Sequence, residues 1–209
     1  MEHRSDLTGH LERIAARRQS LAGELGTILG PHSRFVWEIG AGHGHFLTSF
    51  AQAHPEKLCL GVDLRLERVE RAERKRERAA LTNLHFLRGD AELFLEALPL
   101  GATIEMIFML FPDPWPKLRH HKHRLLKPSF LTALASRCMP GAPIYFRTDF
   151  EPYFAEVKSL LSEDPHWRLE PDDTVWPWTE STVFQQRAPT FHSLVACRRG
   201  GVEASGRPD

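Results

Sequence analysis

Short apolar segments alternate with amphipathic segments along most of this chain. Six apolar segments are rich in β-branched and aromatic residues and are bounded by turn residues, which predicts strands at Arg34–Gly40, Lys57–Asp63, Asn83–Asp90, Ile104–Phe111, Pro143–Asp149 and Phe191–Cys197. Four segments between them repeat apolar residues at helical spacing: Leu64–Leu81, Ala91–Leu98, Pro128–Met139 and Glu151–Leu161. Buried strands joined by crossover helices predict an α/β fold, with a mostly parallel sheet and helices on both faces.

The two ends of the chain differ from this alternating region. From Leu7 to about Ile28 the apolar residues fit one helical face, while Arg13, Arg17 and Arg18 make the helix basic. The last residues lack periodicity and carry Gly, Ser and Pro. We therefore predict a helical extension over residues 1–30, one domain over 31–198 and a disordered tail over 199–209, since 209 residues suit a single core.

The composition is that of a globular protein of the cytoplasm. With 42% hydrophobic and 26% charged residues, disordered and fibrous classes are excluded. Cys59, Cys138 and Cys197 are far apart among apolar neighbours, unlike a disulfide framework or a zinc site. Neither a signal-peptide core nor a run of about 18 apolar residues is present, so we expect no membrane association.

A proline-rich segment follows the fourth predicted strand and is the strongest candidate for an active-site segment. Asp113 lies in FPDPWP, where each proline fixes φ near about −65° and disfavours helix at the residue before it. The segment should therefore be a stiff, extended loop that aims the Asp113 carboxylate and the Trp115 indole. Asp113 is therefore a candidate active-site residue.

A basic run follows immediately. Its members are Lys117, Arg119, Lys122, Arg124 and Lys127, with His120, His121 and His123 among them. Formal net charge is zero, with 27 basic and 27 acidic residues, so binding of a polyanion has to come from such local clustering. The run predicts cations at the edge of the pocket that Asp113 faces, beside a phosphate-rich substrate. Few carboxylates lie near these histidines, so we expect no metal site.

The arginines between Leu64 and Leu81 have a different interpretation. Glutamates alternate with them at the spacing of helical ion pairs. A solvated, ion-paired helix face is therefore favoured over a nucleic-acid-binding stripe.

A cofactor site is predicted where the first three strands end. The first strand runs into Glu38 and a glycine-rich turn from Gly40 through Gly42, where bare backbone allows a ligand to approach. Asp63 ends the second strand, where an acid can bind a ribose diol, and Asp90 ends the third. The alternative is a plain tight turn with two capping aspartates, but open α/β sheets bind ligands at this edge.

The charges of this site favour one cofactor class. The dinucleotide fingerprint needs a further glycine where His45 stands, which argues against NAD. Glu38 is badly placed beside a pyrophosphate, whereas it suits the sulfonium and ammonium groups of S-adenosylmethionine.

Six motifs together resemble a known family. They are EIGAGHGHF, GVD, GDA, FPDPWPK followed by RHHKHRL, FRTD, and TVFQQR. From about Phe35 to Ala196 the chain is similar to bacterial tRNA (guanine-N7-)-methyltransferases. FPDPWPK with its basic run is the specific motif, since methyltransferases in general share only the glycine turn. The resemblance implies a Rossmann-like methyltransferase with an antiparallel last strand, which transfers a methyl group from S-adenosylmethionine to N7 of a guanine in the variable loop of tRNA.

The resemblance also implies roles for individual residues. On the side of S-adenosylmethionine it places Glu38, Gly40, Gly42, Asp63, Asp90 and Asp113. Lys117, Asp149 and the segment from Thr182 to Gln185 would face the tRNA. The sequence departs from the family at two positions, since Gln185 replaces a usual glutamate and His123 a usual arginine. A second register starting at Thr179 would place Thr182 at the acidic position, but FQQR favours the first.

The chemistry of guanine N7 shapes the predicted mechanism. This nitrogen has an in-plane lone pair and no proton, so its attack on a sulfonium methyl group needs alignment and desolvation rather than a strong base. We expect Asp113, the predicted catalytic residue, to act with Asp149 by accepting hydrogen bonds from the guanine edge opposite N7. Trp115 either stacks near the base or forms a wall of the pocket, or it anchors the proline loop in the core.

Two other functions stay open at this point. One is a small-molecule methyltransferase whose basic loop is only a lid, and the other is an RNA-binding protein that keeps the fold without turnover. The arginines of the first helix either contact RNA or belong to a helix that covers a sheet edge. The enzyme is expected to be a monomer or a homodimer.

Overall fold

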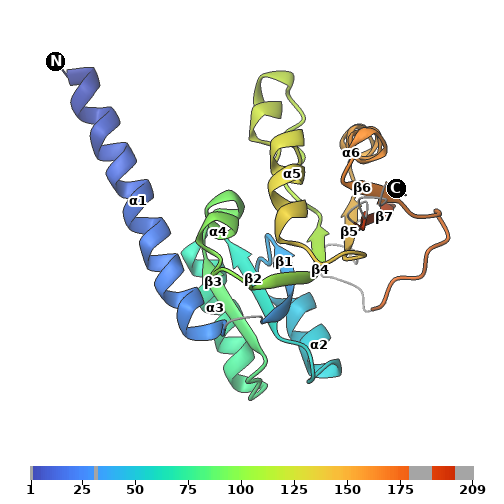
Figure 1. The fold of residues 1–209 in the computed structure, drawn as a ribbon, viewed down its shortest axis with the longest axis horizontal. Helices are drawn as coiled ribbons and strands as arrows, with labels where there is room; N and C mark the ends of the chain where they lie inside the picture. The colour runs from blue at the N-terminus through green and yellow to red at the C-terminus, as the bar shows by residue number, and fades with distance from the viewer. Residues whose placement is uncertain (1, 31–32, 179–189, 201–209) are drawn as a thin grey trace, which may run out of the picture.

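In this computed structural model, residues 2–30, 33–178 and 190–200 are described, and seven strands form one sheet. The strands are β1 (Arg34–Ile39), β2 (Cys59–Asp63), β3 (Leu84–Arg88), β4 (Thr103–Leu110), β5 (Pro143–Thr148), β6 (Trp167–Leu169) and β7 (His192–Arg198). The helices are α1 (Glu2–Ile28), α2 (His45–Ala53), α3 (Leu66–Arg78), α4 (Ala91–Ala97), α5 (Pro128–Arg137) and α6 (Glu151–Glu163), with a 3₁₀ helix η1 (Leu118–His123). Figure 1 shows the helices arranged around the sheet.

The sheet order is β3-β2-β1-β4-β5-β7-β6. Strands β1 to β5 pair in parallel, whereas β7 runs antiparallel to both β5 and β6. The carboxyl ends of β1 to β5 therefore share one edge, which is where open α/β sheets bind ligands. The predicted fold, a mostly parallel sheet with an antiparallel last strand, is confirmed.

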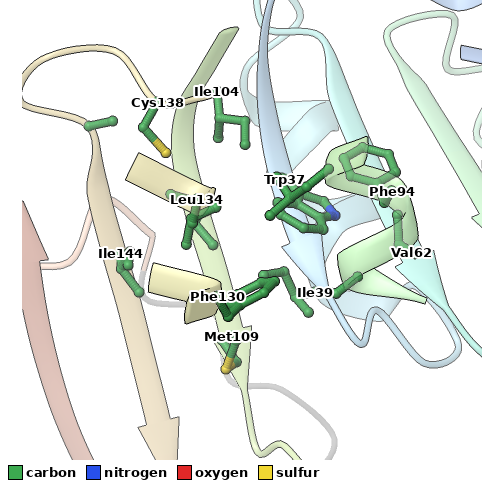
Figure 2. Close-up of a cluster of buried hydrophobic side chains, with 14 of the residues drawn as sticks. Trp37, Ile39, Val62, Phe94, Ile104, Met109, Phe130, Leu134, Cys138 and Ile144 are labelled. Atoms are coloured by element: carbon green, nitrogen blue, oxygen red, sulfur yellow. The ribbon is translucent and has the colours of Figure 1, made fainter. Parts of the chain in front are cut away.

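Apolar cores lie on both faces of the sheet. On one face, α1, α4, α5 and α6 contribute to a core in which Trp37 stacks on Phe94 at 4.5 Å between ring centroids. Figure 2 shows this core, with Phe130 and Leu134 of α5 near Met109 and Ile104 of β4. On the other face α2 and α3 bury a second apolar cluster. Alternate residues of each strand face opposite sides, so both sides of β1 are covered.

Helix α1 packs beside α4 through its carboxyl-terminal half. Leu21 and Leu25 are buried, and Arg18 lies 3.7 Å from Glu96 of α4. A Cβ atom on Gly89, just before α4, would lie 3.2 Å from Leu21. The amino-terminal end of the helix projects beyond the rest of the chain (Figure 1). In the described part of the chain, no helix is both long and apolar enough to cross a membrane.

Besides α2, for which no residue range was predicted, two elements lie outside the sequence prediction. The edge strand β6 has three residues, of which only Trp167 is buried, so it is too short for an alternating pattern. The 3₁₀ helix η1 has no buried residue and consists of Leu118 and five basic or histidine residues. Hydrophobic periodicity cannot identify a turn of helix that has no apolar face.

Gly44 is a position where the fold requires glycine. Its φ is 68°, and a Cβ atom there would lie 2.5 Å from Phe86 and 2.7 Å from Ala72. Gly44→Ala is therefore expected to lower the free energy of unfolding by about 2 kcal/mol or more, through backbone strain and overpacking. Gly26→Ala is the control, since nothing lies within 4 Å of its Cβ position and the helix should gain up to about 1 kcal/mol. Urea denaturation measures both, and equal stabilities would contradict this packing role.

Candidate active site

A cavity of about 380 Å³ opens at the carboxyl edge of the sheet. Of the predicted residues, Gly40, Asp63, Asp90 and Asp113 line it, and these follow or end four different strands. A groove of similar volume, about 410 Å³, lies on α6 and contains none of the predicted site residues. The cavity at the strand ends is therefore the candidate active site.

Asp63 supports the glycine-rich turn from the neighbouring strand. Gly42 donates its N–H to Asp63 Oδ2 at 3.0 Å, and Arg65 donates its N–H to Oδ1 at 2.9 Å. Gly40, Gly42 and Gly44 have φ values of 73°, 55° and 68°, a region that glycine adopts without strain. The conformation of the turn is therefore supported by its own glycines and by this carboxylate, and of these glycines only Gly40 is among the cavity residues.

Asp90 combines a structural role with its place in the cavity. Its Oδ1 accepts hydrogen bonds from the N–H groups of Glu92 at 2.8 Å and Leu93 at 3.4 Å, which caps the amino terminus of α4. Within the described residues, Oδ2 accepts no hydrogen bond, and Asp90 lines the cavity. The capping alternative and the binding prediction are thus compatible, because capping uses only one of the two oxygens.

Glu38 does not line this cavity but lies behind it. It belongs to β1, faces the α2 side of the sheet and is only 4% exposed. Burial raises the pKa of Glu38 to about 8; the Leu47 backbone N–H lowers this pKa and the nearby Asp63 raises it. Its Oε2 atom is buried without a hydrogen-bond partner among the described residues. A buried polar atom of this kind usually has a hydrogen-bond partner in a native structure.

The proline loop departs from the extended conformation predicted for it. Phe111 and Trp115, which precede Pro112 and Pro116, have φ values of 51° and 44°. This left-handed conformation is uncommon for such residues and marks strain that the surroundings must support. The Phe111 N–H donates to the Arg147 carbonyl of β5 at 2.7 Å, which supports the first of the two corners.

The prediction that Arg124 supplies one of the cations at the edge of the pocket is wrong. Lys117, Arg119 and Lys122 are exposed, but Arg124 is only 3% exposed and makes hydrogen bonds within the protein. In the sequence Arg124 lies among other cationic residues, but its burial depends on the residues that surround it in the folded structure. The run thus presents fewer cations to solvent than its composition indicates.

Trp115 lies at the mouth of the cavity. It lines the cavity with His123, at 5.0 Å between the ring centroids, and His120 packs edge-on at 5.7 Å. The indole is half-buried and belongs to neither apolar core of the described structure. Of the two sequence interpretations, the structure favours a wall of the pocket over a core anchor.

Unlike most residues predicted for the cofactor side, the residues predicted for the substrate side do not line the cavity together. Lys117 and Asp149 are exposed and follow β4 and β5, the two neighbouring strands, without lining the cavity. Thr182 and Gln185 lie outside the described residues. The structure therefore places Asp113 and Asp149 after adjacent strands at one edge of the sheet.

Several cavity residues were missed by sequence reasoning. Arg68 of α3 lines the cavity and its Nη1 lies 3.5 Å from Asp63 Oδ2, although its helix was interpreted as a solvated face. Leu125 and Tyr153 also line the cavity, from the segment before α5 and from α6. Leu125 lies in a loop and Tyr153 on a helix, and both resemble ordinary core residues in the sequence, so no sequence signal distinguishes these two.

Solved structures share this architecture at low sequence identity. TrmN from Thermus thermophilus matches with a TM-score of 0.56 and 19% identity, over 87% of this chain and 48% of that one. The 16S rRNA (adenine(1408)-N(1))-methyltransferase from Catenulisporales acidiphilia, solved with SAM, matches with a TM-score of 0.56 and 18% identity, over 87% of this chain and 93% of that one. These likenesses show the fold. A family model described as "Putative methyltransferase" also matches residues 32–192. The chain therefore belongs to this methyltransferase family and has the Rossmann-like fold.

Curated relatives narrow the class to one family. A tRNA (guanine-N(7)-)-methyltransferase of Nitrosomonas europaea is 33% identical over 166 residues, covering 78% of this chain and 74% of the relative. The proteins of the same name from Caulobacter vibrioides and Thermus thermophilus are 38% and 35% identical, covering 68% and 75% of this chain. The chain spans 62% and 50% of those two relatives. It belongs to the tRNA (guanine-N(7)-)-methyltransferase family, as the motifs predicted.

Proposed function

We propose that this protein transfers a methyl group from S-adenosylmethionine to N7 of a guanine in tRNA. The observation that carries the proposal is the cavity at the strand ends, where Asp63, Asp90 and Asp113 meet beside the strained proline loop. Membership of the family supports the tRNA substrate. The variable loop of tRNA is the expected position of the guanine, by resemblance to the family.

The cofactor side is assigned to residues that the geometry suits. Asp63 and Asp90 offer carboxylate oxygens to the ribose hydroxyls and the adenine amino group, and Gly40 and Gly42 allow close approach of the ligand. We assign the ammonium group to Glu38 Oε2, which lies outside the cavity lining and has no hydrogen-bond partner among the described residues. When bound, S-adenosylmethionine supplies an electrophilic methyl group on a sulfonium.

The substrate side orients guanine rather than activating it. N7 carries no proton, so Asp113 and Asp149 act by holding the opposite edge of the base through hydrogen bonds. Trp115 offers a flat face at the mouth of the cavity, where an unstacked base can lie.

The exposed cations beside the loop are assigned to the tRNA backbone. Lys117→Gln and Lys122→Gln should each weaken tRNA binding and reduce the slope of log affinity against log salt by about 1, because one phosphate contact is lost. Lys57→Gln is the control, since Lys57 pairs with Glu105 at 2.9 Å at the opposite edge of the sheet. Filter binding across a salt series measures the slopes. Equal slopes for all four proteins would remove the loop from the tRNA interface.

Transfer of a labelled methyl group to tRNA that lacks the modification tests the proposed function. Incorporation mapped to guanine N7 supports it. A label that enters small metabolites but not tRNA would indicate a small-molecule methyltransferase, and tRNA binding without incorporation would indicate a binding protein without turnover. Either of these outcomes would overturn the proposal.

Further properties are proposed with the function. We place the enzyme in the cytoplasm, acting as a monomer or homodimer and without a metal ion. The division into a helical extension over 1–30, a methyltransferase domain over 31–198 and a tail over 199–209 also stays a prediction. These follow from the composition, the scattered cysteines and a tRNA substrate.

A further inference from the structure

A buried arginine holds the proline loop by its backbone. Arg124 donates from Nε to the Pro114 carbonyl at 2.9 Å and from Nη2 to the Trp115 carbonyl at 3.4 Å. These two carbonyls come directly after Asp113 in the chain. Arg124 itself is 3% exposed, so the donor side of both bonds is shielded from water.

The other side of the same guanidinium is fixed to α6. Its Nη1 donates to the Glu156 carboxylate, and its central carbon lies 4.8 Å from the centre of the Tyr153 ring. Tyr153 is itself buried and lines the cavity. One side chain therefore connects the loop that carries Asp113 to the helix that forms the cavity wall.

The proline loop has few other means of support. Pro112, Pro114 and Pro116 have no N–H to donate. Within the described residues, no other side chain donates to the carbonyls of Pro114 and Trp115. Trp115 is also held at a φ of 44° before a proline, a conformation that persists only when its surroundings impose it.

We propose that Arg124 is a positioning residue for methyl transfer, which sets the conformation of residues 113–115 and so aims Asp113 and Trp115 at the substrate. This inference rests on the proposed function for its kinetic consequence. Asp113 is exposed and bonded to no described residue, so its direction depends on the loop backbone. An error of about 1 Å at such a group can cost about 100-fold in rate.

The geometry requires arginine rather than any cation. A guanidinium presents five N–H donors in one plane, and here three of its nitrogens bond to three different acceptors. A lysine can still pair with Glu156, but its single nitrogen at the end of a flexible chain does not span both carbonyls and the carboxylate. Arg124→Lys therefore keeps the charge and removes the bridge.

The test combines kinetics with the signal of the loop itself. We expect Arg124→Lys to lower single-turnover methyl transfer at least tenfold while the dissociation constant for S-adenosylmethionine changes less than threefold. With 5-fluorotryptophan in the protein, the ¹⁹F resonance of Trp115, assigned through Trp115→Phe, should shift or broaden. The resonances of the fully buried Trp37 and Trp167 should stay in place.

Arg137→Lys is the matched control. Arg137 also bridges two backbone carbonyls, those of Leu98 at 2.6 Å and Pro99 at 2.9 Å, but it lies away from the cavity. Arg137→Lys should leave both the rate of methyl transfer and the Trp115 resonance unchanged. If Arg124→Lys does not fold, Glu156→Gln provides a second variant, because it leaves the guanidinium in place without its charged partner and should lower the rate about threefold while perturbing the Trp115 resonance.

Three results would overturn the inference. They are a wild-type rate in Arg124→Lys, an unchanged Trp115 resonance, or a simultaneous shift of Trp37 and Trp167 that reveals a general structural defect. The ¹⁹F result does not depend on the substrate. A wild-type protein that transfers no methyl group to tRNA would therefore refute the proposed function alone.

Discussion

Asp113→Ala is expected to reduce methyl transfer to tRNA by about 100-fold or more, because the guanine loses the group that orients it toward the methyl donor. The free energy of unfolding should change by less than about 0.5 kcal/mol, since Asp113 is exposed and bonded to no described residue. Binding of tRNA should weaken only slightly, as phosphate contacts dominate affinity. Single-turnover kinetics, thermal unfolding and filter binding measure the three quantities.

The control for this variant is Asp173→Ala, another exposed aspartate in a loop away from the cavity. It should leave all three quantities unchanged. Full activity in Asp113→Ala would remove Asp113 from the catalytic site. Loss of folding along with activity would show that its role is structural, which its exposure argues against.

Glu38→Gln is expected to change the dependence of stability on pH. The pKa of the folded carboxyl is raised to about 8 by burial, above the ordinary value of 4.5. Between these two values the unfolded chain loses the proton while the folded chain keeps it, so the stability of the wild type falls as pH rises and levels off above about 8. The loss is on the order of a few kcal/mol. Glutamine does not titrate, so the variant should gain stability relative to the wild type from pH 5 to 8.

The same substitution should weaken cofactor binding. A neutral amide loses the charge-assisted hydrogen bond to the ammonium group, worth about 1.5–3 kcal/mol, so the dissociation constant for S-adenosylmethionine should rise about 10- to 150-fold. Binding to the wild type near pH 7 should also release a proton from Glu38, which calorimetry in buffers of different ionisation enthalpy detects.

Glu105→Gln is the control for both effects, because Glu105 pairs with Lys57 at the amino edge of the sheet. It should bind the cofactor as the wild type does. An unchanged affinity of Glu38→Gln for S-adenosylmethionine would refute the role of Glu38 in cofactor binding. Parallel curves of stability against pH for the wild type and Glu38→Gln would refute its raised pKa. The two measurements are independent, so the cofactor-binding role and the raised pKa of Glu38 are tested separately.

Much of the fold could be predicted from the sequence because its strands are buried on both faces. Such strands appear as compact apolar runs, and the crossover helices between them carry the apolar face that covers the sheet. All six predicted strands are present with ends that differ by at most two residues. Strand β6 was not predicted, because an edge strand of three residues is too short to show a pattern of apolar positions.

The candidate site was predicted where it depends on strand ends. Asp63, Asp90 and Asp113 each follow or end a parallel strand, so the topology alone brings them to one edge. The glycine turn and the prolines are also local features, in which backbone chemistry is encoded by residue type. These parts of the site follow from the order of residues along the chain.

The sequence by itself determined the fold class, the family and the residues at the strand ends, because each depends on local pattern and on parallel pairing. Only the tertiary structure decided which charged side chains are buried and which are exposed to solvent. Arg124 is one cation among several in the sequence, yet its burial against Tyr153 and Glu156 makes it a support for the loop. Glu38 is one of several acids, yet full burial raises its pKa to about 8. Burial and the neighbours of a charge come from segments far apart along the chain, so tertiary packing alone sets them.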